Sequence, residues 1–170
     1  MIKLVRPSKE IKEKVLSFKK DFLDNNESVI NGSELLDKTE DFDQWLAAVT
    51  ANTNPETVNP AWVLTDTFFA VDDTEKIVGI IDLRHTLNDF LKDCGHCGYS
   101  VRPSERKKGY ATEMLKQLKI FAKDSGMENL QLAVERSNEA SVKTILKNGG
   151  VYERTFEFEN QPADVYRIAL

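Results

Sequence analysis

The first fifty residues carry one strand-like and two helix-like patterns of apolar positions. Residues 2–6 alternate apolar and polar side chains, which is typical of a short strand. The next apolar residues recur three or four positions apart, at Ile11, Val15, Phe18 and Phe22. This spacing predicts an amphipathic helix over residues 9–24. A second helix is predicted from about Asp41, because Asp41 and Gln44 resemble a capping box in front of an apolar run.

The remaining sequence alternates between strand and helix patterns. Residues 50–61 hold two prolines and no periodicity, so they predict a long loop with a potential functional role. Residues 86–93 form a second polar connection. Strands are predicted at residues 65–73, 76–85, 96–101, 130–135, 151–157 and 163–169. A helix of roughly 15 residues is predicted through Ala111, Met114 and Leu118, closed by Gly126, and a shorter helix runs from the cap Asn138 to about Asn148.

The resulting order, β-α-α-β-β-β-α-β-α-β-β, predicts the fold class. It indicates an α/β (α+β) protein in which a mixed central sheet of about seven strands is flanked on both faces by four helices. A chain of 170 residues with 41% hydrophobic residues is long enough for one core. We therefore expect residues 1–170 to form a single domain.

The charge of the chain restricts its partners. The formal net charge is −5 and the sequence pI is about 5.2. General binders of nucleic acids or anionic membranes use broad basic surfaces, so we expect neither partner here. The sequence has no apolar run of the length that a signal peptide or membrane span needs, which predicts a cytoplasmic protein.

One local basic segment stands out on this acidic chain. Residues 99–115, YSVRPSERKKGYATEML, join a predicted strand to a predicted helix through a loop with four basic residues and Gly109. The start of a helix exposes unpaired N–H groups that favour an anion, and a glycine lets the backbone approach a phosphate closely. The alternative interpretation is a solvated basic loop that caps an amphipathic helix.

The letters of this segment resemble a known signature. RKKGYA, residues 106–111, resembles the Q/R-x-x-G-x-G/A motif of the GNAT superfamily of N-acetyltransferases, and VRPSE before it resembles the V-x-P-E approach of that superfamily. Asn138, Ser141, Lys147 and Gly149 resemble its second conserved stretch. The resemblance covers residues 66–157, and the β-α-α start is compatible with it.

This resemblance implies an enzyme that moves an acetyl group from acetyl-CoA to a primary amine of a small molecule or peptide, by direct attack in a ternary complex. Many members form dimers, so a homodimer is compatible with it. Pantetheine is expected in a splay between the strands at 96–101 and 130–135, and pyrophosphate on the N–H groups of residues 106–111. The implied acetyl-CoA contacts are Tyr99, Ser100, Val101, Arg106, Lys107, Lys108, Gly109, Tyr110, Ala111, Asn138 and Ser141. For Asn138 the alternative role is a helix cap.

Transfer to an amine needs a neutral nitrogen, but a lysine-type amine of pKa ~10.4 is almost fully protonated at neutral pH. Candidate bases are His96 and His85, for which a plain structural histidine is the alternative. Tyr99 is a further candidate for a proton-transfer role. Ile145 stands where many GNAT enzymes carry the tyrosine that protonates the CoA thiolate, which leaves the general acid unassigned. This departure motivates an alternative function, a CoA-binding regulator or sensor without efficient turnover.

The segment Cys94-Gly-His-Cys97 has the letters of a thiol-redox centre. That chemistry needs the first cysteine at the N-terminus of a helix, whereas here a strand is predicted to follow. A zinc site needs further ligands, and the chain has only two histidines and no second cysteine pair. We therefore expect no metal site and no redox function.

Overall fold

The computed structural model describes residues 1–170 and confirms the predicted order of elements. The helices are α1 (Lys12–Asp24), α2 (Phe42–Ala51), α3 (Tyr110–Asp124) and α4 (Glu139–Lys147). The strands are β1 (Ile2–Val5), β2 (Thr65–Asp72), β3 (Ile77–Arg84), β4 (Tyr99–Val101), β5 (Asn129–Glu135), β6 (Val151–Phe158) and β7 (Gln161–Ala169). Short 3-10 turns at Lys9–Ile11 and Pro103–Glu105 precede α1 and α3.

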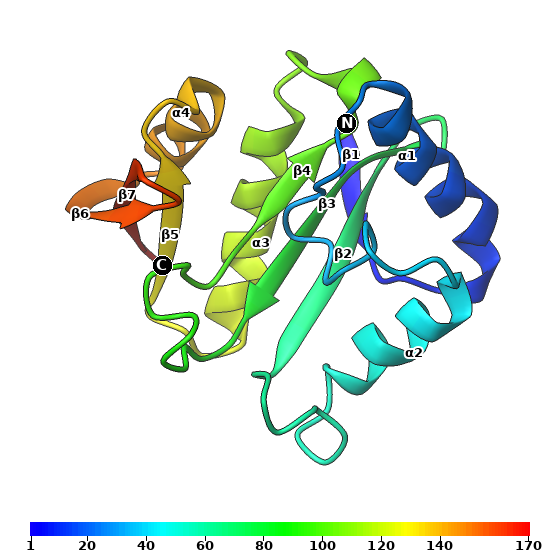
Figure 1. Ribbon diagram of the computed structural model, residues 1–170, viewed down its shortest axis with the longest axis horizontal. Coiled ribbons are helices and arrows are strands. Elements are labelled where there is room, and N and C mark those ends of the chain that lie inside the picture. Colours follow the sequence, from blue (N-terminus) through cyan, green and yellow to red (C-terminus); the bar gives the residue numbers. More distant parts are fainter.

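The seven strands form two sheets. One has the order β1-β2-β3-β4 and the other β5-β7-β6, and every pair of neighbouring strands is antiparallel. The sheets meet at one bridge, between Gly95 and Leu132, and β4 and β5 diverge from there (Figure 1). A cleft can therefore open between two strands that a continuous sheet would have hydrogen-bonded together.

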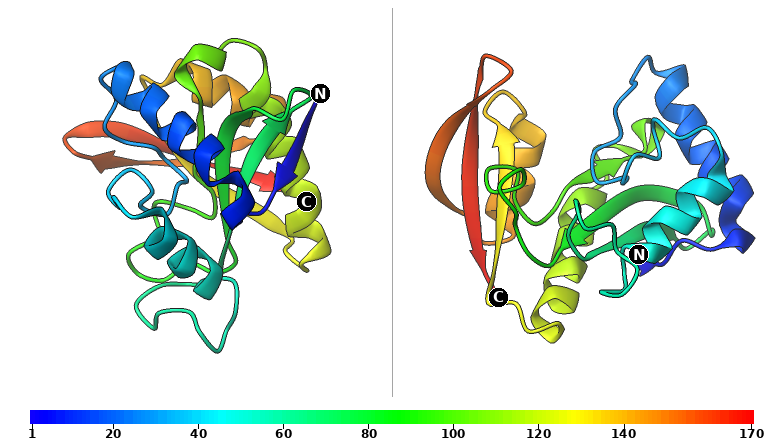
Figure 2. Two further views of the ribbon diagram at one scale, coloured as in Figure 1. Left: turned by 90° about the vertical axis from the view of Figure 1, so that its right-hand side faces the viewer. Right: turned by 60° about the horizontal axis from the view of Figure 1, so that its bottom comes forward.

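The helices cover opposite faces of the four-stranded sheet. Alternating side chains of β2 point to opposite faces, so Phe69 packs with α1 and α2 while Phe68 packs with α3. The core around α3 also contains Ile145 of α4 and the inward side chains of β5 and β7. One apolar core thus joins the two sheets, although Figure 2 shows them as separate bodies of the ribbon.

The structure differs from the sequence predictions in two local details. The strand predicted at residues 96–101 is hydrogen-bonded as a strand only at Tyr99–Val101. The capping box predicted for α2 is one-sided, because the Asp41 carboxylate accepts the N–H groups of Asp43 and Gln44 but the Gln44 side chain makes no return bond. No helix is both long enough and apolar enough to cross a bilayer.

Candidate functional site

A cavity of about 920 Å³ occupies the cleft between the two sheets. Its walls come from β4, β5, the loop before α3, and α4, which together include almost every predicted contact residue. The predicted contacts that line it are Tyr99, Ser100, Val101, Arg106, Lys107, Gly109, Tyr110, Ala111, Asn138 and Ser141. Of the predicted acetyl-CoA contacts, Lys108 alone does not line the cavity.

The edge of β4 offers unpaired backbone groups to the cavity. Arg102 N–H bonds to Val78 O and Asp82 N–H to Gly98 O, at 2.8 and 3.1 Å. Bonding alternates along an antiparallel pair, so Ser100, which lies between these bonds, also turns its backbone to β3, while Tyr99 and Val101 turn theirs to the cleft. An extended ligand can therefore bond to Tyr99 and Val101, but the backbone of Ser100 is already engaged, which corrects its predicted contact.

The loop before α3 has the backbone geometry of an anion cradle. Lys107 and Gly109 both have positive φ, 64° and 82°, and the N-cap position Gly109 supplies no side-chain cap. The N–H groups of residues 107–112 have no acceptor within the protein. Consecutive N–H groups at a helix start, together with its partial positive charge, are a strong anion site. A Cβ on Gly109 would meet no protein atom within 4 Å, so the space beside it is open.

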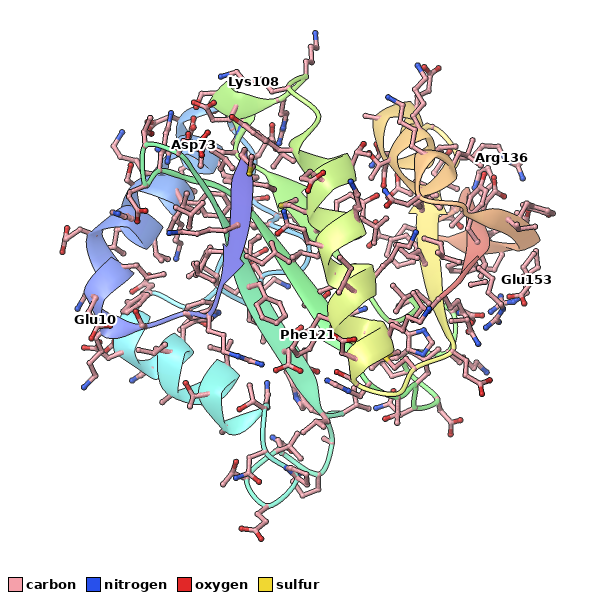
Figure 3. All side chains as sticks on the ribbon, turned by 180° about the vertical axis from the view of Figure 1, so that it is seen from behind. Glu10, Asp73, Lys108, Phe121, Arg136 and Glu153 are labelled. Carbon is pink, nitrogen blue, oxygen red and sulfur yellow. The ribbon has the colours of Figure 1, made fainter.

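The basic side chains of this loop serve different purposes. Arg106 makes a two-pronged ion pair with Glu27, at 2.7 and 2.6 Å, which ties the loop to the segment after α1. Lys108 bonds to Glu105 and lies at the outer tip of the loop (Figure 3), so its side chain does not reach the predicted site. Lys107 lines the cavity and has no ion-pair partner, and it is the loop cation best placed to meet a phosphate.

The opposite wall, α4, contributes a cap and a hydroxyl. The Asn138 side chain accepts the N–H of Ser141 at 3.2 Å, so Asn138 is a helix cap and also lines the cavity. The Tyr99 hydroxyl lies 2.7 Å from the Ser141 hydroxyl and so bridges β4 and α4 across the cleft. Burial raises the pKa of Tyr99, which keeps this phenol protonated at neutral pH. Ile145 is buried beside it and also lines the cavity.

Both predicted histidine bases lie outside the cavity lining. His96 Nδ1 accepts the N–H of Gln131 at 2.9 Å, where the two sheets meet, and burial lowers the pKa of His96. His85 Nε2 lies 2.6 Å from the Asp66 carboxylate. Each imidazole thus has a structural partner, and the geometry favours neither as the base.

Cys94 and Cys97 are free thiols that line the cavity. Neither begins a helix, and burial raises the pKa of Cys97 well above its ordinary value. A buried thiol with a raised pKa is a poor nucleophile, so Cys97 does not have the chemistry of a redox thiol, and Cys94 lacks the helix start that such a centre needs.

Comparison with known proteins shows the family of this chain. Residues 20–151 match the family model described as "Acetyltransferase (GNAT) domain". This chain belongs to the GNAT acetyltransferase family. It is an N-acetyltransferase, and GNAT enzymes take the acetyl group from acetyl-CoA. The sequence matches no curated protein.

Solved GNAT structures share the fold over the whole chain. A GNAT-family acetyltransferase from Streptococcus pneumoniae superposes with a TM-score of 0.71 at 14% identity, and all of both chains is covered. A proposed ribosomal-protein-serine acetyltransferase from Vibrio cholerae gives 0.68 at 16%, covering 99% of this chain and 94% of the other. Mutant forms of the spermidine/spermine N-acetyltransferase SpeG from Vibrio cholerae give 0.66 at 16%, covering 99% and 95%. At these identities the similarity shows the fold alone.

Sequence reasoning missed part of the site. Lys143 of α4 lines the cavity, but its sequence signal is only a lysine on an amphipathic helix. Glu34 lies in a polar segment without periodicity, and yet its side chain is largely buried beside the fully buried Asp82. An acidic residue inside a predicted loop gives no signal of such burial, so only the folded chain identifies it.

Proposed function

We propose that the cleft binds acetyl-CoA and that the enzyme passes its acetyl group directly to a primary amine in a ternary complex. The observation that carries this proposal is the run of unpaired N–H groups at residues 107–112 in the same cavity as the unpaired edge of β4. A cofactor with a pyrophosphate and an amide-containing arm needs both features, and the lysines of the cavity add positive potential. Bound acetyl-CoA supplies the activated thioester.

We further propose a role for each wall. The N–H groups of Tyr99 and Val101 orient the extended arm, the loop of residues 107–112 holds the phosphates, and Asn138 contacts the arm from α4. The Tyr99 hydroxyl is the general acid that protonates the leaving thiolate. Its support is its position in the cavity and the protonated state that burial imposes. Tyr99 thus replaces the tyrosine that many GNAT enzymes carry at the position of Ile145, whose side chain has no proton to donate.

Calorimetry with acetyl-CoA tests this function. We expect binding by the wild-type protein and none by Gly109→Trp, because an indole at Gly109 fills the open space beside the N–H groups. Circular dichroism of the variant controls for folding. A thiol-release assay with primary amines then tests transfer. Wild-type protein that does not bind acetyl-CoA, or a folded Gly109→Trp that binds normally, would contradict the proposal.

A further inference from the structure

A second cavity, of about 420 Å³, adjoins the first. The two share four lining residues, namely Val29, Asn31, Gly32 and Arg84. The second cavity lies between the segment after α1 and the loops around residues 61–65 and 88–91. A ligand in it would therefore reach the first cavity beside Gly32, whose backbone crosses that of Tyr99.

Two glycines fix the segment after α1 against β4. A Cβ on Gly32 would lie 2.2 Å from Gly98 O and 2.8 Å from Tyr99 N, and Gly32 has a φ of 74°. The Ser100 hydroxyl donates to Asn31 O at 2.9 Å on the same crossing. This close crossing places Glu34, two residues further along, at the second cavity.

The Glu34 side chain is held in an unusual environment. One of its oxygens, Oε2, is buried and receives no hydrogen bond from a protein donor, and the same is true of Asp82 Oδ2. Asp82 is fully buried, its Oδ1 accepts Gly98 N–H at 2.5 Å, and its Oδ2 lies 2.9 Å from an Arg84 nitrogen. Asp82 lies beside Glu34, and its carboxylate disfavours the charged form of the Glu34 side chain.

The cavity beyond Glu34 has apolar walls that reach solvent. Four of its lining side chains are large, apolar and exposed, with exposed fractions of 57, 44, 39 and 82% for Val29, Leu35, Trp62 and Phe90. Exposed apolar side chains that gather around one cavity mark a ligand site. The pocket therefore suits a molecule with an apolar body.

We propose that Glu34 is the base that takes the proton from the acceptor's ammonium group, and that the acceptor is a monocationic primary amine with an apolar, aromatic-sized body. The body lies against Trp62 and Phe90, and the amine lies at Glu34, which lines the second cavity two residues after Gly32, a residue that both cavities share. This inference rests on the proposed function, since it places the acceptor beside the thioester of the first cavity.

The proton balance is complete. One proton of the ammonium group passes to Glu34 and on to solvent, and the neutral nitrogen forms a bond to the acetyl carbon while the carbon–sulfur bond breaks. Tyr99 gives its hydroxyl proton to the departing thiolate. The nitrogen releases its second proton to solvent, which reprotonates Tyr99. The products are the N-acetyl amine, CoA thiol and one proton.

The electrostatic surroundings suit a base that works near neutral pH. Burial and then the neighbouring Asp82 raise the pKa of Glu34 to about 8, against the opposing charge of Arg84. The other charged groups of this cavity are Asp37, whose carboxylate accepts Ile30 N–H, and Lys38. An amine that loses its proton to a group of this pKa becomes nucleophilic without alkaline solvent.

The test compares Glu34→Gln with wild type, with 2-phenylethylamine as acceptor and spermidine as the polycationic comparator. Gln has the shape of the protonated carboxyl, and Glu40→Gln makes the same change at an exposed position of the same segment. Thiol release is measured from pH 6 to 9.5, and acetyl-CoA affinity by calorimetry.

We expect wild type to prefer 2-phenylethylamine at least tenfold in kcat/KM, with a rate that rises through about pH 8. Glu34→Gln should lower kcat/KM about 100-fold or more and abolish the rise of the rate through about pH 8. Glu34→Asp, which keeps a carboxylate, should retain part of the rate that Glu34→Gln loses. Acetyl-CoA affinity should change in none of the variants, and Glu40→Gln should match wild type.

Three results would overturn this inference: a preference for spermidine, no turnover of 2-phenylethylamine, or a Glu34→Gln rate that still rises through about pH 8. If the wild type binds acetyl-CoA in the same experiments, the proposed function still stands. Loss of acetyl-CoA binding in wild type would instead contradict the proposed function itself.

Discussion

Substitution of Gly109 by alanine separates the strain of a left-handed backbone from the loss of an anion site. Gly109 and Gly126 lie at opposite ends of α3 with φ of 82° and 87°, and a Cβ at either would meet no protein atom within 4 Å. A left-handed backbone costs a non-glycine residue roughly 1–2 kcal/mol. Both Gly→Ala variants should therefore lose about the same free energy of unfolding. Each kcal/mol lost should lower the melting temperature by about 2–4 °C.

Only Gly109→Ala should weaken acetyl-CoA binding. Its methyl group enters the open space beside N–H groups that have no protein acceptor, and a hydrogen bond to a charged group contributes about 1.5–3 kcal/mol. We expect Kd to rise about 10- to 100-fold. Calorimetry and thermal unfolding of both variants, in one buffer, measure the two effects. Equal affinities for the two variants would refute the assignment of this cradle.

Three further outcomes follow from the geometry. Tyr99→Phe loses the hydroxyl that bonds to Ser141, so it should lower kcat about 100-fold and leave acetyl-CoA affinity near that of the wild type. An unchanged kcat in the transfer assay would exclude the role of Tyr99 as the general acid. Lys107→Ala should weaken acetyl-CoA binding several-fold and reduce the salt dependence of that binding. Lys116→Ala, the same change on the exposed side of α3, should leave both unchanged. Calorimetry at two salt concentrations measures the affinity of each variant. The pKa of Glu34, about 8, exceeds its unfolded value of 4.5, so its contribution to stability is fully present below pH 4.5 and is lost as pH rises to 8. Glu34→Gln should thus gain on the order of 1–3 kcal/mol relative to wild type between pH 4.5 and 8, and pH-dependent urea unfolding that shows no gain would contradict the raised pKa of Glu34.

The elements of this fold could be predicted because their signals are local. The apolar spacing that predicted α3 gives the side chains Met114, Leu115, Leu118 and Ala122, all of which are fully buried. The glycine and basic residues before α3 predicted an anion site for the same reason, since the turn, the N–H groups and the helix start lie within one short segment.

Other features of the site could not be predicted because they depend on contacts between distant segments. Ser100 is next to Tyr99 in sequence, and only the register with β3 decides which of them faces the cleft. Arg106 and Lys108 look equivalent in sequence, but each is bound by a different carboxylate, Glu27 and Glu105. Charge in a sequence does not say which cation is left for a ligand.

The sequence by itself determined the order of strands and helices, the position of the proposed anion cradle and the resemblance to the GNAT family, because periodicity, glycine geometry and helix starts act over a few residues. The tertiary structure alone decided that β4 and β5 part, that Tyr99 meets Ser141 across the gap, and that Glu34 is buried against Asp82. These features arise when separate segments exclude water from a shared space. Burial of that kind sets hydrogen-bond partners and pKa values, and it is a property of the packed chain rather than of any stretch of its letters.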